Sequence, residues 1–390
     1  MSQKKIPAVF MRGGTSKALV FNRADLPDDQ DQWASVFLAA MGSPDPYGRQ
    51  LDGMGGGQSS LSKVCVISKS AREDADVDYT FAQVSVLGEA VDYSGNCGNM
   101  SSAVGPYAYE EGLVSGPANG ECLVRIHNTN SGKIIHSTFR VSNGQACVRG
   151  EVTLTGLASK RSPVVLSFID PANTLGRGLL TQARARHELQ TLRGETVSVS
   201  LVDSAIPSVF VLAESLGLEG TIMPDQLETD QSSLAELEYI REQASILMGI
   251  AETVEQARAI IAIPKLCIVS QPESYQALNG QQINAADVDL VVRMISAGQP
   301  HRAAPITVSL AVASAAAVAG TLVNEVAQGA PNLQRLRLGT PSGVIEVGAK
   351  IEACAHSAIP RIHAAEIVRT QRRLMEGLVC IPSTSDDNNG

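Results

Sequence analysis

Short runs of β-forming residues recur along the whole of this 390-residue chain, with turn residues between them. They occupy residues 8–11, 18–21, 63–67, 79–86, 123–127 and 164–168 in the first half, and residues 196–202, 207–212 and 262–269 in the second. Each half also contains a polar turn that is followed by one apolar segment of helical character. The pattern therefore predicts a mixed α/β chain whose two halves share one plan.

The expected helices lie at corresponding places in the two halves. In the first half a helix follows Cys97 and runs to Glu111, before Gly112. In the second half a long apolar helix begins near Pro305, and a helical insertion is expected at residues 232–248. No clear sequence repeat accompanies this order, so the internal duplication is inferred from element order alone.

The charged stretch at residues 184–188 marks the expected boundary between two domains. The domains are assigned as residues 1–188, residues 189–375 and a C-terminal strand and tail at residues 376–390. We expect this last strand to return to the first domain and residues 383–390 to be frayed.

Composition describes an enzyme-sized chain and argues against a nucleic-acid-binding protein. The formal net charge is −9 at pH 7, and no run of Lys or Arg offers a local exception. The seven cysteines are scattered, odd in number and without a C-x-x-C pair. We therefore expect reduced thiols in the cytoplasm, with neither a disulfide framework nor a zinc site.

Neither a secretory signal nor a membrane span is expected. The N-terminal residues lead directly into a strand, without an apolar core and a cleavage site. Residues 305–323 are uncharged over nearly the thickness of a bilayer, but Ala, Ser, Val, Thr and Gly dominate them and no second span accompanies them. This segment is therefore predicted to be a buried helix.

The segment from Asp92 to Ser101 places one cysteine, Cys97, in a turn rich in Gly and Asn that opens a helix. Unpartnered amide groups and the positive end of the helix dipole favour a thiolate there, and they can also hold a carboxylate. The alternative is that Cys97 is a small buried apolar residue. The glycine-rich context favours an acid/base catalyst.

Lys63 heads an apolar strand after a glycine-rich segment, residues 52–62. Desolvation makes the neutral amine of a lysine more available as a base, whereas a strand-edge lysine with its ammonium in water is the alternative. The glycine-rich segment matches neither standard phosphate-loop spacing, so nucleotide binding is rejected.

Two other polar segments offer hydrogen-bond donors. Residues 12–17 lie between two strands and suit either a carboxylate or a simple turn. His301 and Arg302 precede the second apolar helix and suit either an anion or a solvated cap. Hydrolase interpretations lack support, because no metalloprotease motif, nucleophile elbow or plausible triad order is present.

Six segments, taken in order, give the chain a wider resemblance. They are Arg12–Lys17, Ser62–Val64, Ser94–Asn99, His301–Ala303, Thr340–Gly343 and Arg372–Gly377. In this combination the chain resembles the PrpF family, which includes 2-methylaconitate cis-trans isomerase, methylitaconate isomerase and 4-oxalomesaconate tautomerase. The resemblance covers nearly the whole chain. It implies the α/β (α+β) diaminopimelate epimerase-like fold, with two similar domains, each a curved, mainly antiparallel sheet around a central helix, and an active site between them.

The resemblance also implies the site residues. Cys97 corresponds to a cysteine that the epimerases use on one face of the substrate, and Lys63 to a lysine proposed as its acid/base partner. Two-thiol racemisation is not expected, because residues 300–305 lack the second cysteine of the epimerases. Substrate-binding groups are expected at Arg12, Thr15, Ser16, Lys17, Ser62, Ser94, Asn96, Gly98, Asn99, Lys265, His301, Arg302, Ser342 and Gly343.

The expected activity is isomerisation of an unsaturated di- or tricarboxylate, 2-methylaconitate or aconitate first, without cofactor or metal. A place in propionate catabolism by the 2-methylcitrate cycle follows from the resemblance. A tautomerase, a methylitaconate double-bond isomerase and a non-catalytic carboxylate-binding protein remain alternatives. The expected partner is a small polycarboxylate rather than nucleic acid or membrane. The sequence leaves both a monomer and a homodimer open.

Overall fold

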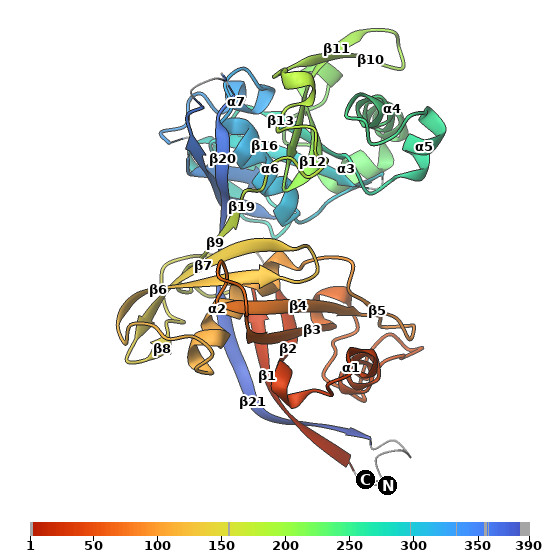
Figure 1. The fold of residues 1–390 in the computed structure, drawn as a ribbon. Coiled ribbons are helices and arrows are strands. Elements are labelled where there is room, and N and C mark those ends of the chain that lie inside the picture. The colour runs from red at the N-terminus through yellow and green to blue at the C-terminus, as the bar shows by residue number, and fades with distance from the viewer. Residues whose placement is uncertain are drawn as a thin grey trace. The chain divides into compact units, whose positions relative to one another are not determined.

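The computed structural model describes residues 3–154, 157–296, 298–332, 334–354, 357 and 359–382. Backbone contacts divide the chain into two compact units (Figure 1). The first unit comprises the residues up to Leu166 together with those from Arg369 onward, and the second comprises Ser167–Val368. The predicted frayed tail, residues 383–390, lies outside the described residues.

The unit boundaries differ from the domain limits expected from sequence. Residue 188 falls inside strand β10 (His187–Gln190), which pairs with its neighbour in the second unit. The charged residues around it lie at exposed positions on a strand and on the turn that precedes it. Their charge therefore reflects exposure to solvent and does not mark a linker between domains. The return to the first unit starts at Arg369, before the expected residue 376.

The described residues of the first unit form strands of a mainly antiparallel sheet and two α-helices. Its strands are β1 (Gln3–Gly13), β2 (Ser16–Asn22), β3 (Lys63–Lys69), β4 (Val77–Val84), β5 (Val91–Asp92), β6 (Gly120–Asn128), β7 (Lys133–Ser142), β8 (Gln145–Ala146) and β21 (Gln371–Pro382). Its helices are α1 (Trp33–Met41), α2 (Gly98–Glu110) and the 3-10 turns η1 (Arg23–Asp25), η2 (Gln30–Gln32) and η3 (Ser59–Leu61). The main pairing order is β21–β1–β2–β3–β4–β6–β7, with β2–β3 and β4–β6 parallel and the other pairs antiparallel.

Helix α2 is the central helix of this unit, which confirms the helix predicted after Cys97. Residues 100–108 are all buried, and the helix packs on β1, β6 and β7. Small side chains permit this close packing: a Cβ atom added at Gly105 would lie 2.5 Å from Ser137 Oγ. Gly112, with φ +68°, follows the helix end as expected.

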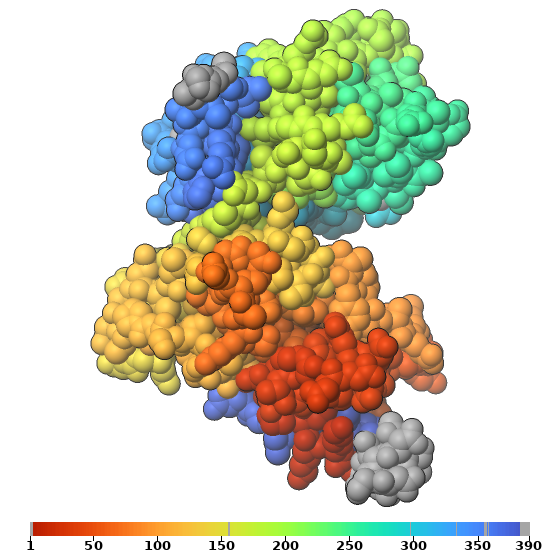
Figure 2. All heavy atoms as spheres, in the orientation of Figure 1, coloured from red at the N-terminus to blue at the C-terminus, as the bar shows by residue number. Residues whose placement is uncertain are grey.

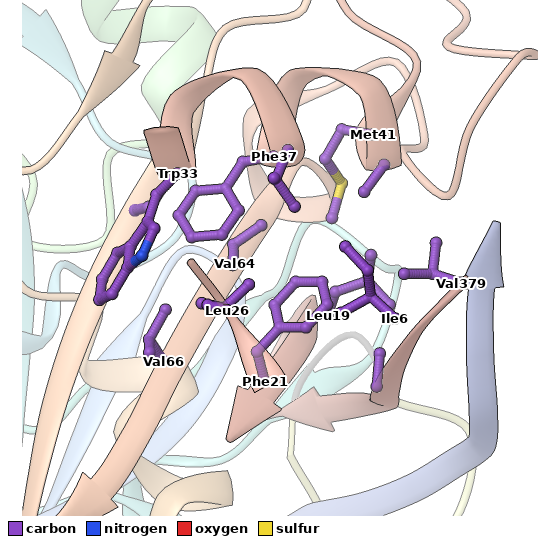
Figure 3. Close-up of a cluster of buried hydrophobic side chains, with 14 of the residues drawn as sticks. Ile6, Leu19, Phe21, Leu26, Trp33, Phe37, Met41, Val64, Val66 and Val379 are labelled. Atoms are coloured by element: carbon purple, nitrogen blue, oxygen red, sulfur yellow. The ribbon is translucent and has the colours of Figure 1, made fainter. Parts of the chain in front are cut away.

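Helix α1 covers the opposite face of the sheet. Phe37 stacks on Phe21 of β2, with ring centroids 5.9 Å apart, and Trp33 lies beside Phe37 (Figure 3). Val64 and Val66 of β3 join this cluster. Because strand side chains alternate between faces, Lys63 and Cys65 point to the other face, where α2 lies.

The second unit contains a longer list of elements. Its strands are β10 (His187–Gln190), β11 (Thr196–Ser204), β12 (Ile206–Leu212), β13 (Lys265–Ser270), β14 (Tyr275–Gln276), β15 (Gln282–Ile283), β16 (Leu290–Ser296), β17 (Gln299–Pro300), β18 (Leu336–Thr340), β19 (Gly343–Glu352) and β20 (Arg361–Arg369), and β9 (Val164–Ile169) contains the unit boundary. Its helices are α3 (Pro224–Thr229), α4 (Gln231–Leu247), α5 (Val254–Ala259), α6 (Ile306–Ala316), α7 (Leu322–Val326) and the 3-10 turns η4 (Thr181–Ala183), η5 (Glu214–Leu216) and η6 (Ala285–Asp287).

The second unit repeats the strand pairing of the first. The order β11–β12–β13–β16–β18–β19 has parallel pairs at β12–β13 and β16–β18, as β2–β3 and β4–β6 are in the first unit. Helix α6 lies in the β16-to-β18 connection, as α2 lies between β4 and β6. The structure thus contains two similar units, each a mainly antiparallel sheet around a central helix, as the resemblance implied.

A short sequence repeat, undetected in the sequence analysis, accompanies this duplication. Residues 63–68 read KVCVIS and residues 265–270 read KLCIVS, at equivalent strands β3 and β13. An ion pair is repeated as well. Arg125 Nη2 lies 2.7 Å from Asp76 Oδ1, and Arg337 Nη2 lies 2.7 Å from Asp289 Oδ1. Each ion pair lies where a parallel strand pair begins, β4–β6 in the first unit and β16–β18 in the second. Lys265 is therefore the structural equivalent of Lys63.

The apolar segment expected to form one helix over residues 305–323 is divided in the structure: α6 ends at Ala316 and α7 begins at Leu322. Residues 308–316 of α6 are all buried. In the part of the chain that the structure describes, every helix is too short or too polar to span a bilayer. The helical insertion predicted at residues 232–248 is confirmed as α4. Together with α3 and α5 it lies in the β12-to-β13 connection, as α1 lies in the β2-to-β3 connection, and it forms part of the surface of the second unit (Figure 2).

Candidate active site

Cys97 occupies the N-cap position of α2. Its backbone is extended, with φ −103° and ψ 96°, and its side chain makes no capping hydrogen bond. Its carbonyl oxygen accepts hydrogen bonds from the Ser101 amide at 2.9 Å and the Ser101 hydroxyl at 3.1 Å. The half-buried thiol therefore lies at a helix end whose amide groups favour negative charge.

The turn between β1 and β2 packs tightly against the first turn of α2. A Cβ atom at Gly13 would lie 2.5 Å from the Asn99 carbonyl oxygen, and one at Gly14 would lie 2.2 Å from Asn99 Oδ1. Asn99 Nδ2 donates to Thr15 Oγ1 at 3.2 Å. The two glycines of the Arg12–Lys17 segment are thus required for a close backbone approach to the helix that carries Cys97.

Arg12 holds this turn in place. Its Nη1 donates to the carbonyl oxygens of Gly14 at 2.7 Å and Thr370 at 3.0 Å. Burial, with smaller contributions from Arg161 and Arg372, lowers the pKa of Arg12 to about 10. The arginine is thus a structural anchor of the turn, and its carboxylate-binding role stays a prediction.

Lys63 is buried at the start of β3. Its Nζ donates to Gln83 Oε1 and lies 5.0 Å from the centroid of the Phe81 ring. Both partners lie on β4, which pairs antiparallel with β3 and places Gln83 directly opposite Lys63. Among the described residues Lys63 forms no ion pair, so the charge of its ammonium has no protein counter-ion there.

Cys65 connects Lys63 with Cys97. Burial raises the pKa of the Cys65 thiol; Cys97 adds to this effect, while a hydrogen bond with Tyr79 and the charge of Lys63 oppose it. Burial, followed by Cys65 and Cys97, also raises the pKa of Tyr79. Lys63 and Cys97 are thus both near enough to Cys65 to affect the pKa of its thiol. The raised pKa values of Cys65 and Tyr79 keep both groups protonated near neutral pH. The acid/base role expected of Lys63 and Cys97 stays a prediction.

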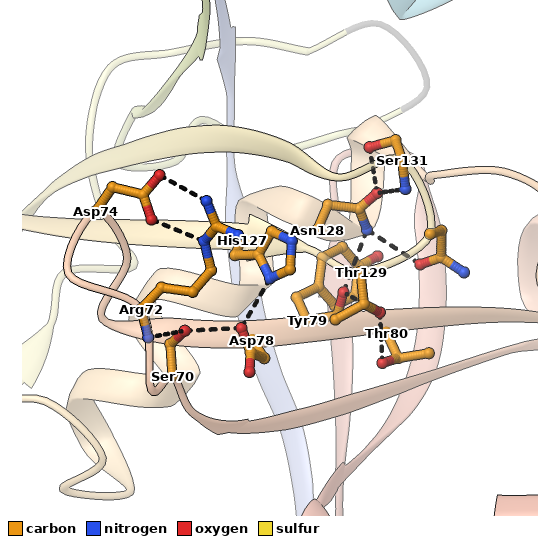
Figure 4. A network of polar contacts seen from close by, with 11 residues as sticks. Ser70, Arg72, Asp74, Asp78, Tyr79, Thr80, His127, Asn128, Thr129 and Ser131 are labelled. Carbon is orange, nitrogen blue, oxygen red and sulfur yellow. Dashed lines mark hydrogen bonds and ion pairs between the residues drawn. The ribbon is translucent and has the colours of Figure 1, made fainter.

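A polar network holds strand β4 along the edge that pairs with β6, opposite the edge that pairs with β3 (Figure 4). Asn128 Nδ2 donates to the Tyr79 carbonyl oxygen at 3.2 Å, and the hydroxyls of Thr80 and Thr129 lie 2.7 Å apart. These contacts hold β4 against the end of β6 and so fix the strand from which Tyr79, Phe81 and Gln83 project.

The second unit presents an equivalent lysine. Lys265 begins β13, is half-buried, and its Nζ hydrogen-bonds Ser296 Oγ of β16. Burial, with Arg241, lowers the pKa of Lys265. Burial, with Lys265, also lowers the pKa of His301, and the buried His301 Nε2 has no hydrogen-bond partner among the described residues. Lys265 and His301 therefore form one polar group with unused hydrogen-bonding capacity.

Arg302 is held by the insertion. Its guanidinium lies 2.5 Å from Asp225 and 3.1 Å from Glu228, both on α3, and these carboxylates raise its pKa. Ser342 Oγ donates to the Arg302 carbonyl oxygen at 2.5 Å, and Thr340 Oγ1 donates to the Gly343 carbonyl oxygen at 2.7 Å. The structure thus brings Arg302 and the 340–343 turn together, with the arginine charge already neutralised.

The other predicted residues fall in the first unit. Ser62 is fully buried and donates to the Val84 carbonyl oxygen at 3.0 Å. The Ser94 amide donates to Asp92 Oδ1 at 2.7 Å, and Asn96 Oδ1 accepts from Ser101 Oγ at 3.3 Å. Gly98 begins α2; Ser16 is buried, and Lys17 Nζ lies 5.5 Å from the Phe10 ring.

Sequence reasoning missed Cys65, Tyr79 and Gln83. The repeat of Lys63 and Cys65 in Lys265 and Cys267 was the available signal for the lysine and thiol pair. No comparable signal marked the two β4 residues. Among the described residues, no group of three or more His, Cys, Asp or Glu side chains is placed to hold a metal ion.

Comparisons with known proteins place this chain in a family. The model of the family described as "PrpF protein" matches residues 3–382. A 2-methyl-aconitate isomerase of Cupriavidus necator is 40% identical over 97% of this chain and 98% of its own, and a 3-methylitaconate isomerase of Eubacterium barkeri is 37% identical over 97% and 98%. A crystal structure of methylitaconate-delta-isomerase matches with a TM-score of 0.89 at 36% identity, covering 99% of both chains. The chain belongs to the PrpF family.

Proposed function

We propose that the protein is an isomerase of unsaturated polycarboxylates and that 2-methylaconitate is its substrate. The observation that carries the proposal is the pair of equivalent lysines, Lys63 and Lys265. Each is at least half-buried, each begins an equivalent strand, and neither has a carboxylate partner among the described residues. The similarity to isomerases of 2-methylaconitate and 3-methylitaconate supports the choice of substrate.

The lysine environment favours an anionic ligand. A buried charge is unfavourable unless another charge or several hydrogen bonds compensate it. Among the described residues, the two lysines have only neutral oxygens as hydrogen-bond partners. The carboxylates of a bound polyacid would supply the missing countercharge. We propose that the remaining predicted binding groups, including Thr15, Asn96 and His301, donate hydrogen bonds to these carboxylates.

The proposed chemistry is proton removal and return. Lys63 or the Cys97 thiolate takes a proton from a carbon conjugated, through a double bond, with a carboxylate. The electron pair left behind spreads into the carboxylate oxygens, and the intermediate is a dienolate-like carbanion. Protonation then restores a neutral carbon with a new alkene geometry or position. Donors at the α2 N-terminus, next to Cys97, stabilise the charge that develops on oxygen.

A substrate screen tests this function. We expect purified protein to convert 2-methylaconitate between its cis and trans forms, followed by ultraviolet absorbance and proton NMR, with incorporation of solvent deuterium. Methylitaconate, trans-aconitate and 4-oxalomesaconate are the comparison substrates. Preferential turnover of 4-oxalomesaconate would make the protein a tautomerase. Binding of polycarboxylates without turnover of any of them would make it a carboxylate-binding protein.

Lys265 is expected to anchor a substrate carboxylate. The Lys265→Met variant should raise KM by about tenfold and leave kcat within about threefold, because the lost interaction is present in both the ground state and the transition state. Lys350→Met, which removes an exposed lysine of the same unit, is the matched control. A fall in kcat equal to the fall in kcat/KM would instead give Lys265 a role in proton transfer.

We also propose a cytoplasmic location and a homodimer. All seven cysteines are unpaired in the structure, which fits the reducing conditions of the cytoplasm. The dimer rests on the resemblance alone.

A further inference from the structure

The hydrogen bonds around Lys63 give one neighbouring residue a defined task. Lys63 and Gln83 are cross-strand neighbours, and the amine nitrogen donates to the amide oxygen of Gln83. An amide oxygen can only accept hydrogen bonds, so this contact fixes the direction in which one N–H bond of Lys63 points.

The orientation of the Gln83 amide is itself fixed. Its Nε2 donates to the Ser62 carbonyl oxygen at 2.9 Å and the Ser59 carbonyl oxygen at 3.1 Å. An amide nitrogen carries two hydrogens; these two carbonyls are the nearest acceptors, and the Val84 carbonyl oxygen lies farther away, at 3.4 Å. Rotation of the amide by 180° would break both bonds and turn its N–H groups toward the Lys63 amine. The oxygen therefore must face Lys63.

The segment that supplies these carbonyls is also held. Gln50 is 1% exposed, and its Nε2 donates to Ser62 Oγ at 2.7 Å and to Ser43 Oγ at 2.8 Å. Its Oε1 accepts from the Gly57 amide at 3.0 Å. Ser62 Oγ donates in turn to Val84, next to Gln83. Hydrogen bonds of Gln50 and Ser62 thus hold the glycine-rich segment in place beside the Lys63–Gln83 pair.

Among the described residues, the equivalent position in the second unit shows no such set of hydrogen bonds. Lys265 meets Ser296, whose hydroxyl rotates and can either donate or accept. The duplicated units therefore hold equivalent lysines in different ways. The lysine with the fixed acceptor is the one beside Cys65, and so the one that shares this thiol with Cys97.

We propose that Gln83 is a positioning residue for proton transfer by Lys63, and that it directs the amine through a hydrogen bond whose geometry the glycine-rich segment fixes. The inference rests on the proposed function, since it assumes that Lys63 carries a proton. In this proposal Lys63 transfers a proton and Lys265 only binds, because Lys63 faces the fixed amide oxygen of Gln83 whereas Lys265 faces the rotatable hydroxyl of Ser296.

The Gln83→Met variant tests the proposal with two measurements. We expect kcat for 2-methylaconitate to fall by about tenfold with KM within about threefold, because misdirection of the amine affects proton transfer more than binding. In a Lys63→Met background the same change should have no further effect on kcat. Gln145→Met, an exposed strand glutamine of the same unit, is the control.

The second measurement requires no turnover. Trace acetylation with acetic anhydride, followed by peptide mass spectrometry, reports the reactivity of each lysine amine. Loss of the acceptor should raise labelling of Lys63 several-fold relative to Lys265 in the same sample, because an amine that no longer donates to Gln83 is freer to turn toward the reagent. Unchanged labelling in a folded variant, or an effect on KM alone, would overturn the inference.

If Gln83→Met does not fold, Gln83→Asn provides the test. Its shorter polar side chain preserves an amide but cannot span Lys63 and both carbonyls, so the same changes in kcat and labelling are expected. Failure of wild-type protein to isomerise any substrate would refute the proposed function, while the labelling result would still judge the role of Gln83.

Discussion

The Cys97→Ala variant is expected to reduce kcat by at least about a hundredfold, which is the low end for loss of a positioned acid/base group. The thiol lies at the N-terminus of α2 and makes no capping bond, so its removal leaves the helix start intact. The expected loss is therefore chemical, with little change in the melting temperature. Progress curves with 2-methylaconitate and thermal unfolding of the same sample would measure both quantities.

Two controls isolate this effect. Cys380→Ala removes an exposed thiol from β21 and should retain wild-type turnover, which excludes a general effect of cysteine loss. Cys97→Ser keeps a hydroxyl at the site but not an easily ionised group, and should lose activity nearly as strongly as alanine. Near-wild-type turnover by either Cys97 variant would show that the thiol is not a proton carrier.

The Lys63→Met variant is expected to lower kcat by about a hundredfold or more, and to affect kcat more than KM. Methionine fills a similar volume in this buried position but cannot exchange protons. Lys63→Arg separates charge from proton transfer, because arginine keeps a positive charge and is not deprotonated under these conditions. If the amine transfers protons, the arginine variant should bind substrate yet turn over as slowly as the methionine variant.

Deuterium incorporation distinguishes the roles of the two groups. When one group removes the proton and the other returns it, loss of the returning group should stop isomerisation while the base still exchanges substrate hydrogen for deuterium, and loss of the base should stop both. A Lys63 variant with an increased KM and an unchanged kcat would make the lysine a carboxylate anchor. The proposed mechanism would then rest on Cys97 alone.

Much of the local structure was predictable because it depends on neighbouring residues. The turn rich in Gly and Asn around Cys97 and the glycine after Glu111 indicated α2, and the structure confirms that helix. The uncharged segment after Pro305 indicated α6, and the charged amphipathic insertion indicated α4. In each case the signal and the element occupy the same stretch of chain.

The contacts of the candidate site were less predictable. Arg302 looked like a free anion ligand beside a helix, but α3, more than seventy residues earlier in the chain, neutralises its charge. Gln83 had no visible relation to Lys63, because their contact depends on the register between β3 and β4. The domain limit expected at residue 188 falls inside β10, since charge marks solvent exposure on a strand as readily as on a linker.

The sequence by itself determined where strands and central helices form, where the Cys97 thiol meets a helix start, and which family the motifs resemble. Hydrophobic periodicity, turn residues and capping preferences act over a few residues, so a linear reading can detect them. Only the tertiary structure decided that Lys63 and Lys265 begin equivalent strands, that both Lys63 and Cys97 affect the pKa of Cys65, and that Gln83 accepts a hydrogen bond from Lys63. Strand register and side-chain burial arise from segments far apart in the chain, and these set which groups meet and which can ionise.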